Sequence, residues 1–260
     1  MPLTSARDSA VEKFRRIADE DPRIIGAFLG GSLAAENADE YSDIDVYYVV
    51  KPEEYSSFHS NIRSLIEKIG RLAYFDEHSD FGFDLVLFMF QDGVKGELGL
   101  GTAEKMRVMH AGPYKVLSDK ANLFKGVSFP YEKIHEGDDL QKNVERELRW
   151  YWYWYGIVLT SAARGQLWSA LSALNTMRGH VFTLLRLAYN IRPGARVEKS
   201  LPPKLLKELG ETVPAYDPAS IRTASATLTT IVKREIKDLL ERSHAEYPLL
   251  FEETVLAKYS

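Results

Sequence analysis

The two halves of this chain carry different repeating patterns of apolar residues. Up to about residue 125, short apolar or β-branched runs such as 24–29 alternate with amphipathic segments, which is typical of strands separated by helices. Further on, apolar residues recur every three or four positions over lengths typical of bundle helices. The sequence therefore predicts an α+β fold with two domains: a mixed-sheet domain over 1–128 and an all-α helical bundle over 129–260.

Each expected element is placed by its periodicity and by the capping and turn residues beside it. The expected strands are 24–29, 43–50, 71–75, 83–90, 94–100 and 114–117. The expected helices are 5–20, 52–69, 102–110, 140–163, 166–190 and 218–246. Glycine, proline and charged residues cluster over 125–139, which predicts a linker or hinge there.

Composition excludes several classes of protein. Hydrophobic residues make up 45% of the 260 residues, which is ample for buried cores. The absence of cysteine excludes disulfides and thiolate metal sites, and no uninterrupted apolar run approaches the length of a membrane span. The net charge of -4 argues against a broad nucleic-acid-binding surface. We therefore expect a cytoplasmic protein without nucleic-acid or membrane partners.

A Gly-Gly-Ser turn and an Asp-x-Asp pair flank the first two predicted strands. Gly30 and Gly31 let backbone N–H groups approach an anion closely, and Ser32 adds a hydroxyl donor. Asp43 and Asp45 project from one face of a strand, where a cation such as Mg²⁺ relieves their mutual repulsion. Either motif alone is more often an ordinary loop or strand edge. Their order and strand context together favour a metal-dependent nucleotide site.

Nucleotidyl transfer also needs a group that accepts the proton of the attacking hydroxyl, and two acids are candidates. Asp84 starts an apolar strand, where a carboxylate is unusual unless it faces a metal or water. Glu97 follows the Asp92-Gly93 turn on a segment that could return beside that strand. Each could instead be an ordinary strand-edge charge, and the residues alone leave the choice open.

Basic residues are needed to hold a triphosphate. Arg178 and Arg186 are eight residues apart on one predicted helix and so share a face, from which they could reach a cleft between the halves. Ion pairing within the bundle is an equal alternative. The aromatic run 150–155 spreads around its helix, so we expect most of it to serve packing, with some residues facing outward. The six histidines show no metal-ligand spacing, and His110 is expected to be a core or scattered residue.

The Gly-Gly-Ser turn followed by Ser42-Asp43-Ile44-Asp45 resembles the DNA polymerase beta-like nucleotidyltransferase superfamily. Among its members the chain is most similar to the two-domain lincosamide nucleotidyltransferases and next to aminoglycoside adenylyltransferases. The resemblance implies a five-stranded mixed sheet, a helical bundle that closes over the acceptor, and often a homodimer. It also implies that Asp43 and Asp45 bind Mg²⁺, and that Glu97 contributes to the metal site and acts as general base. Asp84 matches a third acid of other branches, and we favour Glu97 as the base.

The expected function is an Mg²⁺-dependent transfer of a nucleoside monophosphate, most readily AMP from ATP, with release of pyrophosphate. The expected acceptor is a hydroxyl of a small molecule such as a lincosamide or aminoglycoside antibiotic. Two alternatives stay open at this point. The acceptor could be a protein, as in antitoxin-like modules, or the chain could be a nucleotide-binding module without turnover.

Overall fold

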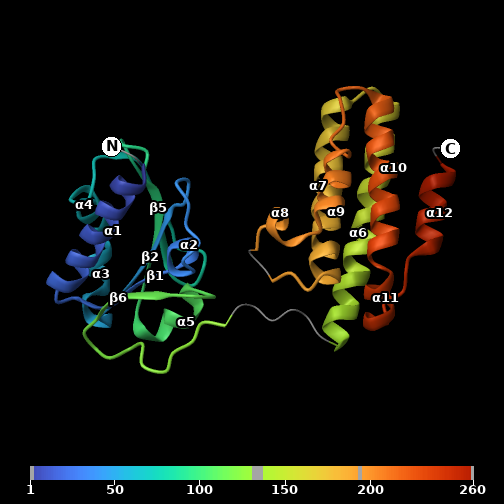
Figure 1. Ribbon diagram of the computed structural model, residues 1–260. Helices are drawn as coiled ribbons and strands as arrows, with labels where there is room; N and C mark the ends of the chain where they lie inside the picture. The colour runs from blue at the N-terminus through green and yellow to red at the C-terminus, as the bar shows by residue number, and fades with distance from the viewer. Residues whose placement is uncertain (1–2, 131–136, 193–194, 259–260) are drawn as a thin grey trace. The chain divides into compact units, whose positions relative to one another are not determined.

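The computed structural model describes residues 3–130, 137–192 and 195–258 (Figure 1). The chain divides into two compact units, Met1–Tyr131 and Glu132–Ser260, which we call the sheet unit and the helical unit. Part of the predicted linker, residues 131–136, lies outside the described residues. Within the described ranges, none of the helices combines the length and apolar character that crossing a bilayer requires.

Six strands form one mixed sheet in the described part of the sheet unit (Figure 1). Their order is β3-β4-β5-β2-β1-β6, and only the β2–β5 pair is parallel. The strands are β1 Ile24–Leu29, β2 Ile44–Val50, β3 Leu72–His78, β4 Asp84–Phe90, β5 Lys95–Gly101 and β6 Lys115–Asp119. All six predicted strands are confirmed. The five-stranded sheet implied by the resemblance is wrong, because β6 also joins the sheet by pairing with β1.

Helices cover one face of this sheet. In α1 (Leu3–Glu20), Ala10, Phe14 and Ala18 are buried at four-residue spacing, which places one stripe of the helix against the sheet. The fully buried Tyr48 of β2 donates its hydroxyl hydrogen bond to the Phe14 carbonyl at 2.7 Å. Figure 1 shows α3 (Tyr55–His59) and α4 (Ile62–Glu67) on this side as well.

The helix predicted over 52–69 is interrupted. The chain forms a 3₁₀ turn, Pro52–Glu54, then α3, and α4 begins only after Ser60 and Asn61. Ser60 Oγ donates to the Ser56 carbonyl at 3.0 Å, and Asn61 Nδ2 donates to the Ser57 carbonyl at 2.8 Å. The Ser56 carbonyl also accepts from Ser60 N, so the helix continues to this point. The Asn61 side chain takes the Ser57 carbonyl and the Asn61 N–H bonds to the Phe58 carbonyl instead, which explains the break.

The other face of the sheet carries a smaller aromatic cluster. Phe28 of β1 and Val49 of β2 are fully buried there against Phe124 and Phe129. Two short elements after β5 border it, the 3₁₀ turn η2 (Ala103–Lys105) and α5 (Met106–Met109). A one-turn helix, α2 (Gly31–Ala34), follows β1 directly.

The helical unit is built around its own apolar core. Its helices are α6 Gly137–Ala163, α7 Leu167–Ala188, α8 Val197–Ser200, α9 Pro203–Gly210, α10 Pro218–Glu235, α11 Lys237–Ser243 and α12 Leu249–Ala257. The helix predicted over 218–246 is wrong as one element, because the backbone at Ile236 leaves helical geometry with φ -98 and ψ 5. The sequence-based interpretation also missed α8, α9 and α12, which are too short to give a clear period.

The aromatic run on α6 divides between core and surface as expected. Tyr151, Trp152 and Tyr155 are buried, whereas Trp150 and Tyr153 are 46% and 51% exposed. The helical turn explains this division, since neighbouring residues point about 100° apart around the axis. Most of the run therefore serves packing.

Candidate active site

The Gly-Gly-Ser turn lies directly against the second strand. Gly30 N donates to the Asp45 carbonyl at 2.9 Å, which fixes the turn at the end of β1. Gly31 has φ +56, a left-handed conformation that favours glycine. A Cβ at Gly31 would overlap the Asp45 carboxylate, so only glycine lets the turn approach this acid.

Sheet register brings two of the predicted acids together. Asp45 of β2 is directly opposite Glu97 of β5 in the parallel pair, so both side chains project from the same face. Asp43 lies one residue before β2. Burial, and then the charges of Asp43 and Glu97, raise the pKa of Asp45 to about 6. Burial and Asp43 also raise the pKa of Glu97, although Lys95 opposes this shift.

These three acids have the donor chemistry of a magnesium site. A divalent cation neutralises the repulsion between neighbouring carboxylates. In the described residues, no three acidic or histidine side chains already converge as a complete metal cage. Mg²⁺ is usually held by one or two carboxylates together with substrate phosphate oxygens and water. Asp43 and Asp45 therefore fit Mg²⁺ that arrives with a triphosphate.

Tyr47 continues the acidic face along β2. Its ring stacks on Phe28 with centroids 4.7 Å apart and planes 8° apart. Burial, followed by the charges of Asp45 and Glu97, raises the pKa of the Tyr47 phenol. The phenol is therefore neutral at physiological pH, and Tyr47 contributes an uncharged aromatic ring and a hydroxyl beside the acids.

Asp84 lies on the opposite face of the sheet. It pairs with Leu100 and shares its face of β4 with Val86 and Phe88, which are buried under the helices. Glu97 points to the other side. Burial alone would raise the pKa of Asp84, but hydrogen bonds from Ser79 and Tyr55 lower it overall. The Tyr55 hydroxyl bonds to Asp84 Oδ2 and also donates to the Leu100 carbonyl at 2.9 Å. The structure thus separates Asp84 from the other predicted acids.

The two predicted arginines have partners inside the helical unit. Arg178 donates to the Thr212 carbonyl at 2.7 Å and to Asn175 Oδ1 at 2.5 Å, and burial lowers the pKa of Arg178. Arg186 donates to the Ala195 carbonyl at 2.7 Å. Both guanidinium groups therefore join helices to neighbouring loops. These partners are neutral oxygens and not the carboxylates that ion pairing within the bundle would supply. Phosphate binding by Arg178 and Arg186 stays a prediction.

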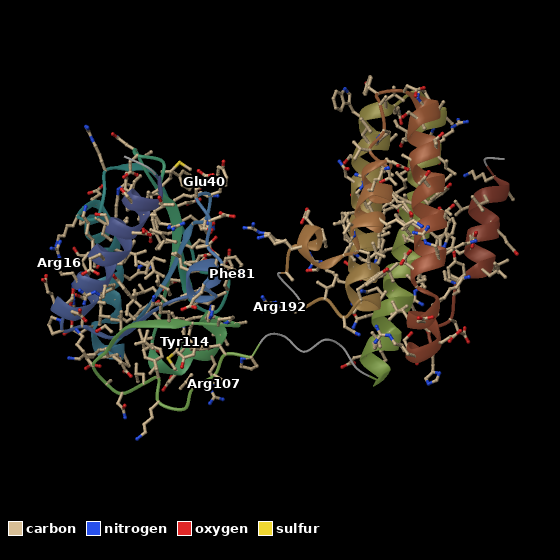
Figure 2. The ribbon with its side chains drawn as sticks, in the orientation of Figure 1. Arg16, Glu40, Phe81, Arg107, Tyr114 and Arg192 are labelled. Atoms are coloured by element: carbon tan, nitrogen blue, oxygen red, sulfur yellow. The ribbon has the colours of Figure 1, made fainter. Side chains whose placement is uncertain are left out.

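The sequence-based interpretation missed two features near the acids. A hollow of about 260 Å³ adjoins the segments that lead into Asp43 and Glu97, and Glu40, labelled in Figure 2, lines it. The full set of lining residues is Arg7, Glu40, Tyr41, Ser42, Gly93, Val94 and Lys95. No local pattern could have shown this hollow, since α1 and the turn before β5 are far apart in sequence.

The second missed feature is His110, whose ring lies against Gly30 and Tyr47. The ring centroids of His110 and Tyr47 are 5.0 Å apart. His110 is contained in the predicted short helix over 102–110, but it ends up in extended geometry just after α5. Its contact with the turn depends on β6 pairing with β1, where Lys115 lies opposite Leu29, and no spacing of residues encodes it.

The chain matches a known protein family and is similar to a solved structure. The family model described as streptomycin adenylyltransferase matches residues 6–259 of the chain. Among solved structures, the chain is similar to the crystal structure of an aminoglycoside 6-adenyltransferase from Bacillus subtilis. That likeness has 19% identity and a TM-score of 0.48, and it covers 97% of this chain and 95% of the other. None of the curated proteins matches.

Proposed function

The chain belongs to the streptomycin adenylyltransferase family and is a nucleotidyltransferase, and from this premise we propose that it transfers AMP from ATP to a hydroxyl of a small molecule in an Mg²⁺-dependent reaction. The observation that carries the proposal is the pairing of Asp45 with Glu97 on one sheet face, with Gly31 against Asp45. A phosphate-binding turn and a cluster of acids are the two parts that such a transfer needs.

The proposed acceptor is an aminoglycoside. The name of the matching family supports this choice over a lincosamide, because streptomycin is an aminoglycoside. The net charge of -4 also suits a polycationic acceptor. The same reaction on a lincosamide or a sugar is retained as an arm of the test below.

In the proposed mechanism, the backbone N–H group of Gly31 and the Ser32 hydroxyl hold the phosphates. Asp43 and Asp45 would hold Mg²⁺, with Glu97 beside them. When bound, the ion neutralises negative charge on the triphosphate as pyrophosphate leaves. These groups act mainly by positioning and by charge stabilisation.

Glu97 is the proposed general base. It accepts the proton of the acceptor hydroxyl while the hydroxyl oxygen attacks the α-phosphorus and the bond to pyrophosphate breaks. Burial and Asp43 raise the pKa of Glu97, which makes its carboxylate a better proton acceptor. Asp84 is not proposed for this role, because it faces the other side of the sheet and bonds to Tyr55.

The test is pyrophosphate release from ATP with Mg²⁺ against a panel of acceptors. The panel contains streptomycin, a second aminoglycoside, a lincosamide and simple sugars, and mass spectrometry identifies the product. We expect an adenylylated aminoglycoside whose mass increases by one AMP. The proposal would be contradicted if none of the acceptors in the panel stimulated pyrophosphate release. It would also be contradicted if the AMP were found on a protein.

Two variants separate the competing acids. Glu97→Gln should lower kcat by at least about a hundredfold, which is the usual contribution of a general base. Asp84→Asn should leave kcat nearly unchanged and lower only the stability, since Tyr55 loses a charged acceptor.

A third variant tests the proposed metal site. Asp45→Asn should abolish the dependence of the rate on Mg²⁺ concentration together with most activity.

The homodimer and the cytoplasmic location are also proposals. The homodimer rests on the resemblance of the sequence to antibiotic nucleotidyltransferases. Light scattering coupled to gel filtration measures the oligomeric state directly, and cell fractionation measures location. A monomer at micromolar concentration would contradict the first proposal.

A further inference from the structure

Adjacent glycines in the phosphate-binding turn are required for two different physical reasons. Gly31 needs glycine because its φ is +56. Gly30 has φ -112 and ψ -159, an extended conformation that other residues also adopt. The need for glycine at position 30 must therefore come from its surroundings.

His110 and Tyr47 occupy the space that a side chain at position 30 would need. A Cβ added to Gly30 would lie 2.7 Å from His110 Cε1, 2.9 Å from His110 Nδ1 and 2.9 Å from Tyr47 Cε2. Contacts this short are well inside the normal separation of non-bonded heavy atoms. The imidazole therefore packs directly against the backbone of the turn.

The His110 ring is itself held in place. Its Nε2 hydrogen-bonds with the Pro113 carbonyl at 2.8 Å. Tyr47, Phe28 and Phe129 surround it, with ring centroids 5.0, 5.5 and 5.4 Å from the imidazole centroid. Burial lowers the pKa of His110 against the opposing effect of nearby carbonyls, which favours a neutral ring that donates from Nε2. The hydrogen bond and the three ring contacts together hold the His110 imidazole in one position against Gly30.

We propose that His110 is a positioning residue that, together with Tyr47, fixes Gly30 so that the Gly31 and Ser32 backbone stays in place to hold the triphosphate. The inference rests on the proposed role of this turn in ATP binding. Tyr47 also borders Asp45 and Glu97, as the effect of their charges on its phenol shows. His110 and Tyr47 thus connect the turn to the acidic face through packing.

The first experiment compares His110→Ala with a matched control, Phe124→Leu, in the full chain. Phe124 is buried in the same aromatic cluster, where its ring packs on Phe28 and Tyr114, and it is not among the nearest atoms around Gly30. Calorimetry gives the Kd of ATP with Mg²⁺, and steady-state kinetics give KM for ATP and kcat. We expect His110→Ala to raise both Kd and KM about tenfold, because the turn loses its fixed position. Phe124→Leu should lower the melting temperature but change the Kd by less than about twofold.

The second experiment asks whether His110 is the reason for glycine at position 30. Gly30→Ala alone should weaken ATP binding strongly, because its methyl group meets the imidazole. In Gly30→Ala/His110→Ala the methyl group enters the vacated space, and Tyr47 can shift into what is left. We therefore expect the double variant to bind ATP more tightly than Gly30→Ala alone, which is a coupling that independent sites do not show.

Two results would overturn the inference. The first is an unchanged ATP Kd in His110→Ala when the wild type binds ATP. The second is a double variant whose loss of affinity is simply the product of the two single losses. Because Kd is measured without acceptor, a wild type that binds ATP and transfers nothing would refute the proposed function alone. A wild type that binds no ATP would refute both.

Discussion

Gly31 lies at the closest approach between the turn and the acids, and its substitution is predicted to be severe. Gly31→Ala combines left-handed backbone strain of about 1–2 kcal/mol with overlap of the new Cβ and Asp45. We expect the variant to lose ATP binding as measured by calorimetry. The control is Gly165→Ala, since Gly165 has φ +71 but no atom within 4 Å of an added Cβ.

Both glycine variants should lose a similar amount of unfolding free energy from backbone strain. Only Gly31→Ala should also lose ATP affinity, because only that methyl group displaces an acid. If the two variants bound ATP equally well, the contact with Asp45 would have no role in the site.

Asp45 is predicted to destabilise the metal-free protein at neutral pH. Its pKa rises from an ordinary 3.8 to about 6, so the folded protein holds this proton more tightly than the unfolded chain does. The free energy of unfolding therefore falls as the pH rises from about 4 to about 6, and the loss persists above that range. In chelator-treated protein, Asp45→Asn should melt at a higher temperature than the wild type at about pH 7.5.

The pH dependence shows whether the stabilisation by Asp45→Asn comes from removing the charge of Asp45 or from the substitution itself. The stabilisation by Asp45→Asn should vanish at about pH 4, where Asp45 itself carries a proton. Asp80→Asn, at an exposed carboxylate, should change the melting temperature at neither pH. An Asp45→Asn variant that is less stable than the wild type at neutral pH would show that the carboxylates do not repel one another.

At the scale of helices, α12 is joined to α10 by a buried charge. Glu252 of α12 is only 5% exposed and forms an ion pair with Lys233 of α10. Lys233 also lies 5.6 Å from the centre of the Tyr247 ring, and the Tyr247 hydroxyl accepts a hydrogen bond from Trp152 of α6 at 3.2 Å. Three helices therefore meet at one polar cluster.

Lys233→Met should leave the Glu252 carboxylate buried without its cation. We expect a loss of about 2 kcal/mol, less than for a fully buried pair because the Lys233 side chain is 45% exposed. Urea unfolding measures the loss. Lys237→Met, at an exposed lysine on α11, is the control and should have little effect. Adding Glu252→Gln to Lys233→Met should restore part of the stability, and a further loss would contradict the ion-pair account.

For the whole molecule, separate cores in the two units predict two unfolding transitions. All four tryptophans lie in the helical unit, at positions 150, 152, 154 and 168. Tryptophan fluorescence should therefore follow only the helical unit, whereas far-ultraviolet circular dichroism follows both. Lys233→Met should shift the fluorescence transition, and Phe14→Ala in the sheet unit should shift only the other one. Coincident transitions in every variant would instead show that the chain unfolds as one cooperative body. The predicted boundary between residues 128 and 129 stays a prediction.

The sequence by itself determined the local features of the fold and the turn. Strand and helix periods are set by neighbouring residues, so all six strands and the two longest helices were predicted close to their observed bounds. The Gly-Gly-Ser turn and the spacing of Asp43 and Asp45 were equally local. The helix predicted over 52–69 was wrong as one element because the Asn61 side chain takes a backbone carbonyl of the helix.

Only the tertiary structure decided which distant residues meet. Asp84 and Glu97 were both plausible from sequence, and a difference in strand register places them on opposite faces of the sheet. His110 reaches Gly30 from eighty positions away because β6, which begins at Lys115, pairs with the end of β1 at Leu29. Periodicity fixes the face of each strand on which a side chain lies, but pairing between strands fixes which faces coincide, and that pairing depends on packing of the whole sheet unit.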